Sequence, residues 1–149
     1  MSGKQLEKEL EIKVVILGES GVGKSCIIIR YENNIFSHIN LSIILCSNVS
    51  KTISLNDDKN VIKYTIWDTA GQEKYKAITR IHYLDADVIL LVFDVTSEDS
   101  FNCIKEYWYP QVKENAPENA IIALVASKCD LKDDTLTWMK FLLMPKKSM

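Results

Sequence analysis

The amino-acid sequence predicts an α/β fold in which a doubly wound, mostly parallel sheet forms a single domain, residues 1–149. Three stretches, 12–17, 87–95 and 120–127, are almost continuously apolar, which is typical of parallel strands covered on both faces. Segments with a helical spacing of apolar residues separate them. Because strand and helix alternate in this way, we expect the three stretches to be central strands with helices on both faces.

The remaining elements follow in chain order. Residues 49–55 and 61–67 flank the turn signal "NDDKN", and the second stretch alternates apolar and polar side chains, which predicts an antiparallel hairpin at a sheet edge. A helix is expected over 97–115, with Ser97 as its N-terminal cap. Pro110 should bend or shorten its last turns. Four apolar residues of this helix recur at helical spacing, namely Phe101, Ile104, Trp108 and Val112.

Composition limits the classes of partner and the cellular compartment. The chain is 47% hydrophobic and 26% charged, which is typical of a soluble globular protein, and its formal net charge of −2 argues against nucleic-acid binding. No secretion signal and no apolar run long enough for a membrane span is visible, so we expect a cytoplasmic protein without an integral membrane segment. The cysteines form no CxxC pair and predict buried, reduced thiols rather than a zinc site or disulfides; they are Cys26, Cys46, Cys103 and Cys129.

The stretch "GESGVGKS", Gly18 to Ser25, lies between two apolar runs and matches the phosphate-binding pattern GxxxxGK[ST]. Glycines permit the tight turn, successive N–H groups point inward, and the following helix adds partial positive charge. Lys24 is expected to reach the β- and γ-phosphates, and the Ser25 hydroxyl to bind Mg²⁺. The predicted nucleotide contacts of this segment are Gly18, Glu19, Ser20, Gly21, Val22, Gly23, Lys24, Ser25 and Cys26.

A second motif, "WDTAGQEKY", Trp67 to Tyr75, follows the second hairpin strand. Asp68 at the strand end is suited to hold Mg²⁺ through water, and the Gly71 N–H to approach a γ-phosphate. Gln72 is suited to orient an attacking water molecule, which makes it the predicted catalytic residue. Together the two motifs indicate nucleotide hydrolysis.

With these motifs, the sequence resembles the small GTPases of the Ras superfamily, and within them most closely the Rab family. The stretches 74–79, 91–101 and 118–131 are similar to Rab segments, and the resemblance runs from about 11 to 131. A Rho-like GTPase is the alternative subfamily, since 107–110 and 130–134 resemble Rho segments. The resemblance implies the small G-protein version of the phosphate-loop NTPase fold.

The resemblance also assigns further site residues. "SKCD" is similar to the guanine-reading motif of the family, with Lys128 along the purine face and Asp130 accepting bonds from the base. Ser127 replaces the usual Asn, and we expect the loss of one or two hydrogen bonds to weaken affinity by roughly tenfold. Phe36 matches the aromatic residue that packs on the nucleotide. Ser42 is the nearest hydroxyl to the expected switch threonine, whose place is taken by Ile43.

The resemblance implies a GTP-binding molecular switch with slow, Mg²⁺-dependent GTP hydrolysis in vesicle trafficking. Its expected partners are an exchange factor, a GTPase-activating protein that supplies an arginine, and effectors that contact the switch regions. Of the aromatic triad that Rab effectors read, Trp67 is retained. The third position falls on or beside His82, which is interpreted either as an ordinary exposed helix residue or as the mark of an altered partner surface.

Residues 132–149 depart from the family pattern. The sequence predicts a divergent or truncated ending that lacks the usual last strand and helix of this fold. Because no cysteine lies in the last twenty residues, prenylation and membrane anchoring are not expected. The alternative to a working switch is a truncated relic that does not cycle, or a binding module for Rab regulators.

Overall fold

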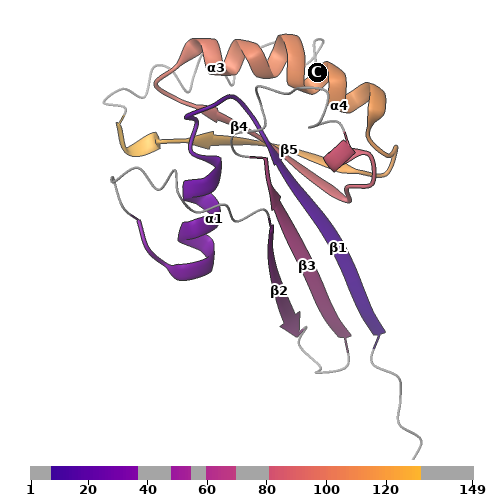
Figure 1. Ribbon diagram of the computed structural model, residues 1–149. Coiled ribbons are helices and arrows are strands. Elements are labelled where there is room, and N and C mark those ends of the chain that lie inside the picture. The colour runs from indigo at the N-terminus through magenta and orange to yellow at the C-terminus, as the bar shows by residue number, and fades with distance from the viewer. Residues whose placement is uncertain (1–7, 37–47, 55–59, 70–80, 132–149) are drawn as a thin grey trace, which may run out of the picture.

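The computed structural model describes residues 8–36, 48–54, 60–69 and 81–131. These residues form one sheet of five strands in the order β2-β3-β1-β4-β5 (Figure 1). The strands are β1 (Lys8–Leu17), β2 (Asn48–Ser54), β3 (Asn60–Asp68), β4 (Val88–Asp94) and β5 (Ile121–Ser127).

All strand pairs are parallel except that of β2 with β3. β1 pairs with both β3 and β4, and β4 pairs with β5. The antiparallel hairpin of β2 and β3 lies at one end of the sheet, with β2 outermost, as its alternating pattern predicted. The expected α/β fold with a mostly parallel sheet is therefore confirmed.

The two faces of the sheet carry two separate apolar cores. On one face, Val15 and Leu17 pack with alternate residues of β4 and with the long helix, which spans residues 98–115. On the other face, Ile16 and Val92 pack with Ile28 of α1 (Lys24–Asn33). Figure 1 shows α1 and the long helix on opposite sides of the sheet. Because successive side chains of a strand point to opposite faces, continuously apolar strands are what a doubly wound sheet requires.

The predicted helix over 97–115 is present, but it is not α-helical throughout. It consists of α3 (Glu98–Cys103), a π-helical turn (Ile104–Trp108) and α4 (Tyr109–Asn115). The Ser97 side chain caps it by accepting a hydrogen bond of 3.2 Å from the Ser100 N–H. All four predicted core residues of the helix are buried.

Pro110 does not shorten the helix, because the chain stays helical to Asn115. The proline ring has no N–H to donate and crowds the carbonyl one turn earlier. The preceding turn is π-helical, and the N–H of Tyr109 bonds to the carbonyl of Ile104, five residues back. We infer that this wider turn makes room for the proline ring.

Two other expectations, both about strands, were wrong. The first strand begins at Lys8, four residues before the predicted Ile12, because residues 8–11 pair with β3 despite their charge. β5 is not a central strand: among the described residues it pairs only with β4, and Ile121 and Leu124 are exposed. A continuous apolar run does not reveal whether a strand has a second neighbour.

The buried-thiol expectation fails as well. Cys26 and Cys129 are exposed and Cys103 is half-buried; none of these three forms a disulfide, while Cys46 lies outside the described residues. No described helix combines the length and the apolar character needed to cross a bilayer.

Candidate nucleotide site

The predicted site residues come together where the parallel strands end. β1 leads into the phosphate loop, defined here as Gly18 to Ser25, and β3 ends at Asp68. β4 ends at Asp94, directly opposite Ser127 at the end of β5. In an open parallel sheet the carboxyl ends of the strands are the usual place for a ligand. The guanine motif, defined as residues 127–130, therefore lies beside the phosphate loop although about a hundred residues separate them.

Close contact with the sheet fixes the start of the phosphate loop. A Cβ on Gly18 would lie 2.2 Å from the carbonyl oxygen of Val92, well inside van der Waals contact, so only glycine fits. Gly23 has a φ of 98° and stands at the N-terminus of α1. Because glycine has no side chain, the N-cap position does not supply an acceptor for the first N–H groups of α1. This cradle of N–H groups fits a phosphate.

Lys24 is folded back onto the loop. Its side chain is buried, at 4% exposure, and its ammonium donates to the carbonyl oxygens of Gly18 at 2.9 Å and Glu19 at 2.8 Å. These bonds hold the ammonium on the inner side of the turn. A positive charge held there suits the β- and γ-phosphates that the motif predicts as its partners.

The candidate magnesium ligands lie on two elements next to the loop. Ser25 belongs to the first turn of α1, and Asp68 pairs with Ile16 at the end of β3. The next residue, Thr69, is buried and donates a 2.7 Å hydrogen bond to the Ile16 carbonyl, which ties the chain after β3 to β1. A hydroxyl and a carboxylate are the oxygen donors that Mg²⁺ prefers, so this donor set fits the ion. Ser42, Gly71 and Gln72 lie outside the described residues.

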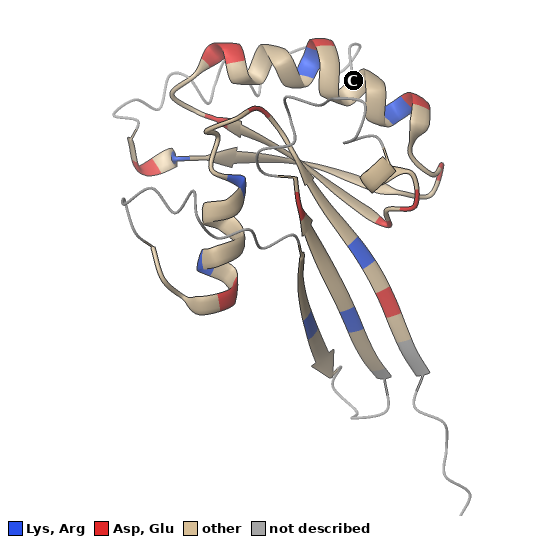
Figure 2. Cartoon of the chain, viewed as in Figure 1, with Lys and Arg blue, Asp and Glu red and all other residues tan. Residues whose placement is uncertain are grey.

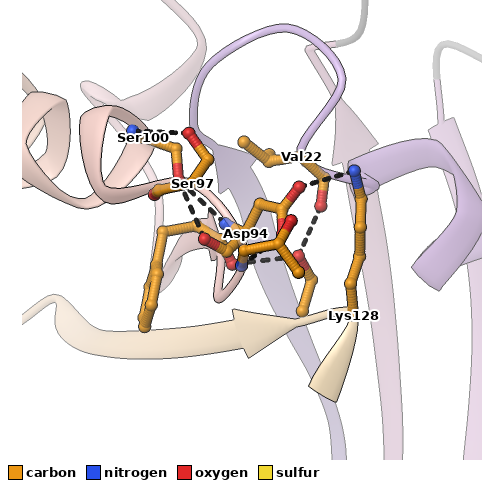
Figure 3. A network of polar contacts seen from close by, with 8 residues as sticks. Val22, Asp94, Ser97, Ser100 and Lys128 are labelled. Carbon is orange, nitrogen blue, oxygen red and sulfur yellow. Dashed lines mark hydrogen bonds and ion pairs between the residues drawn. The ribbon is translucent and has the colours of Figure 1, made fainter. Parts of the chain in front are cut away.

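Ser127 connects the guanine motif to the phosphate loop. Its hydroxyl is buried and lies 2.6 Å from the carbonyl oxygen of Val22 and 2.9 Å from that of Phe93. One hydroxyl proton serves both acceptors, so the bond is shared. The short side chain that replaces the usual Asn thus still bridges the two motifs (Figure 3).

The next residue, Lys128, has a left-handed backbone with a φ of 56°. Its ammonium forms an ion pair of 2.6 Å with Asp94, and Figure 3 shows the lysine side chain running from the end of β5 toward that carboxylate. Burial raises the pKa of Asp94, but the bonds from Lys128 and Thr96 outweigh this and hold the pKa below its usual value. Asp130 follows on the short 3₁₀ turn Cys129–Leu131 and is exposed, as a group that contacts a base from solvent must be.

A cavity of about 310 Å³ lies on the other side of the phosphate loop, between residues 19–22 and the start of α3. Lys24, Ser25 and Asp130 do not line it, and its charged groups are acidic, which disfavours a phosphate. The Glu19 carboxylate accepts bonds there from Trp108 Nε1 at 3.2 Å and from the Cys103 thiol at 2.9 Å. Of the predicted contacts, Glu19 thus retains only its backbone for a nucleotide.

Three residues singled out in the sequence lie at the edges of the site and differ in their exposure. Phe36 is 57% exposed beyond the C-terminal end of α1, and Cys26 is exposed on that helix. His82 is half-buried rather than exposed, since its ring centroid lies 5.9 Å from that of Trp67. The interpretation of His82 as an ordinary exposed helix residue was therefore wrong.

Sequence reasoning missed Asp94. The signal was present, because an aspartate ends the strongly apolar stretch "VILLVFD", and carboxylates are seldom buried unless they are paired. Its partner Lys128 had been predicted only as a contact of the base. Figure 2 shows a negative charge at the end of β4 and a positive charge at the end of β5.

Comparison with known proteins agrees with the motifs. The Ras family model matches residues 13–141. The Ras-related protein Rab-31 of Rattus norvegicus is 38% identical over 123 residues, which is 83% of this chain and 62% of that protein. Rab-1C of Dictyostelium discoideum is 42% identical over 125 residues, 84% of this chain and 61% of that protein. The GTP-binding protein YPT1 of Saccharomyces cerevisiae is 38% identical over 127 residues, 85% of this chain and 60% of that protein.

These relatives bear on the two subfamilies that the sequence left open. Two of the three carry Rab names, as the Rab resemblance predicted. The chain spans about three fifths of the length of the curated relatives it matches.

Proposed function

This chain belongs to the Ras family, and from that premise we propose that it is a Rab-like switch that binds GDP and GTP with Mg²⁺ and hydrolyses GTP slowly. One observation carries the proposal. The Ser127 hydroxyl lies 2.6 Å from the Val22 carbonyl, so the motif for phosphate and the motif for guanine share one edge of the sheet. A single nucleotide that spans both motifs accounts for this arrangement.

Each described residue has a role in this proposal. Lys24 and the N–H groups at the start of α1 bind the phosphates, and Ser25 and Asp68 hold Mg²⁺, which neutralises phosphate charge when it is bound. Asp130 accepts hydrogen bonds from the ring N–H and the exocyclic amine of guanine. Adenine lacks these donors in that arrangement, which leaves the carboxylate unpaired and sets the preference for guanine.

The direct test is a titration of the purified chain with fluorescent GDP in the presence of Mg²⁺. We expect unlabelled GTP and GDP to displace the probe at far lower concentrations than ATP. Asp130→Asn is the sharpest variant, because Asp130 is exposed and its replacement leaves the fold intact. Xanthine has a carbonyl where guanine has its exocyclic amine, so an Asn amide can donate a hydrogen bond to it. The variant should therefore bind GDP more weakly and xanthosine diphosphate more tightly than wild type does. Equal competition by ATP and GTP in the wild-type chain contradicts the proposal.

Hydrolysis is proposed to depend on Gln72, which would orient the attacking water. Gln72→Leu should slow GTP hydrolysis by at least about tenfold and leave GDP affinity within about twofold, because the residue contacts only the water. Single-turnover phosphate release measures the rate. A variant with the wild-type hydrolysis rate removes Gln72 from this role.

The role in vesicle trafficking and the partners of the switch regions are proposed from the Rab relatives alone. The alternative, a binding module that does not cycle, is favoured by one observation: Ile43 stands where the family has the switch threonine. The titration and the phosphate-release assay together separate the two functions. A chain that binds GDP and GTP equally well but never hydrolyses GTP, even with an activating protein, fits the module and not the switch.

A further inference from the structure

Asp94 is a buried carboxylate, 7% exposed, that lies between the two motifs of the site. A buried charge is costly unless it is paired and hydrogen-bonded. Here both oxygens have partners. Oδ2 forms the 2.6 Å ion pair with the Lys128 ammonium, and Oδ1 accepts hydrogen bonds from the N–H of Thr96 at 2.8 Å and from its hydroxyl at 2.7 Å (Figure 3). The carboxylate is thus oriented on one side by Thr96 and directed at Lys128 on the other.

Lys128 determines the direction in which the chain leaves β5. Its φ of 56° is a left-handed conformation that non-glycine residues adopt at a cost. The turn is closed by a 3.0 Å hydrogen bond from the Leu131 N–H to the Lys128 carbonyl, and Asp130 lies inside that turn. The position of the residue predicted to read guanine therefore depends on the conformation of Lys128. The ion pair with Asp94 at the end of β4 ties the Lys128 side chain to the sheet.

The end of β4 also contacts the phosphate loop and the long helix. The carbonyl of Val92 lies against Gly18, and the carbonyl of Phe93 accepts from Ser127. The backbone N–H of Asp94 donates to the Ser100 hydroxyl at 3.0 Å, which anchors the strand end to α3. Because the end of β4 is anchored in this way, the Asp94 carboxylate offers the Lys128 ammonium a fixed partner.

We propose that Asp94 is a positioning residue of the guanine motif, which acts through its ion pair with Lys128 to hold the left-handed turn that presents Asp130 to the base. The inference rests on the proposed function, because it concerns how tightly guanine nucleotide is held. Asp94 does not touch the nucleotide in this account. Its effect should therefore appear in nucleotide release and should require the Lys128 ammonium.

The test is a double-mutant cycle on GDP release. Fluorescent GDP is loaded onto the full chain with Mg²⁺, and its dissociation is followed after addition of excess unlabelled GDP. We expect Asp94→Asn to speed release by about tenfold, and the double variant Asp94→Asn, Lys128→Met to release no faster than Lys128→Met alone. Asp99→Asn, an exposed carboxylate at the start of α3, is the matched control and should stay within about twofold of wild type.

A second variant guards against misfolding of Asp94→Asn. Thr96→Val removes one hydroxyl that orients the carboxylate and should speed release by about twofold to threefold, an effect that disappears in the Lys128→Met background. If Asp94→Asn does not fold, Thr96→Val takes its place, and a GDP release rate equal to that of wild type in Thr96→Val overturns the inference. The inference is also overturned if the two substitutions act independently, so that the release rate of the double variant is raised by the product of the two single effects.

The outcomes separate this inference from the proposed function. If the wild-type chain binds no labelled GDP, both fail. If it binds GDP but release is unchanged in Asp94→Asn, only the inference fails. Thermal melting of the nucleotide-free variants in the same cycle measures the ion pair itself. Coupling in melting without coupling in release means that the contact is structural only and overturns the positioning role.

Discussion

The phosphate loop and the guanine motif lie at the same edge of the sheet, but different contacts hold them. The loop follows a central strand and is fixed by its backbone, since Gly18 fits against Val92 and Lys24 bonds to carbonyls of its own turn. The guanine motif follows β5, which has a single described neighbour, and is fixed by the side chains of Ser127 and Lys128. The phosphate loop therefore depends on a close backbone contact and on bonds within its own turn, whereas the guanine motif depends on polar side chains.

This difference has consequences for mutation. A backbone that fits by contact tolerates no added atom, whereas a motif held by polar side chains weakens in steps as each bond is removed. We therefore expect a change at the close contact of Gly18 to cost more stability than the loss of a side-chain bond in the guanine motif.

The largest expected effect comes from Gly18→Ala. Its Cβ would lie 2.2 Å from the Val92 carbonyl oxygen, so either β4 or the loop must move, and we expect a loss of about 3 kcal/mol in the free energy of unfolding. Urea denaturation measures it. Gly21→Ala is the matched control: its φ is 79°, but nothing lies within 4 Å of the added Cβ, so only about 1 kcal/mol is expected from backbone strain. Equal losses in the two variants contradict the role of the close contact.

A smaller effect is expected from Ser127→Ala. The variant leaves the carbonyl oxygens of Val22 and Phe93 without the hydroxyl donor, which should cost about 1–2 kcal/mol in the free energy of unfolding. GDP release should also become faster, because the two motifs are no longer bridged. Ser50→Ala is the control, since the exposed Ser50 hydroxyl bonds to Thr65 at 2.9 Å and its loss should cost under about 0.5 kcal/mol. Similar costs at the two serines would show that the bridge adds nothing.

The smallest effect concerns pH. The pKa of Asp94 is lowered in the folded chain, so the unfolded chain takes up a proton first as the pH falls. The stabilisation is fully present above the ordinary aspartate pKa of 3.8 and is lost as the pH falls through the lower folded value. Wild type should therefore be more stable than Asp94→Asn above about pH 5, and the gap should close in more acidic solution. Urea midpoints at several pH values measure it, and a gap that persists or widens toward pH 3 is the opposite result.

Much of the fold could be predicted from local patterns. The continuous apolar runs of β1 and β4 and the helical spacing over 97–115 each reflect a single element, and all are present. The edge position of β5 within the described part of the sheet could not be predicted, because an apolar strand looks the same with one neighbour or two. The π-helical turn before Pro110 could not be predicted either, since a proline clash can be relieved by bending, by ending the helix, or by such a turn.

The candidate site divides in the same way. Gly18, Lys24, Ser25 and Asp68 were predicted from short motifs whose chemistry is local, and the guanine motif was predicted from the family resemblance. The side-chain contacts of Glu19 with Trp108 and Cys103 join residues more than eighty positions apart, and no spacing rule connects them. The partial burial of His82 against Trp67 could not be predicted for a related reason, because it depends on how the chain returns to the sheet.

The sequence by itself determined the strand-loop-helix unit predicted to bind phosphate and the residue types proposed for Mg²⁺ and guanine, because turn geometry and donor chemistry are properties of neighbouring residues. Only the tertiary structure decided that Ser127 bonds to Val22 and that Lys128 pairs with Asp94. Those contacts depend on strand order and register, which place the ends of β4 and β5 beside the phosphate loop. Strand order is set by packing of the whole sheet against its helices, which no short stretch of sequence specifies.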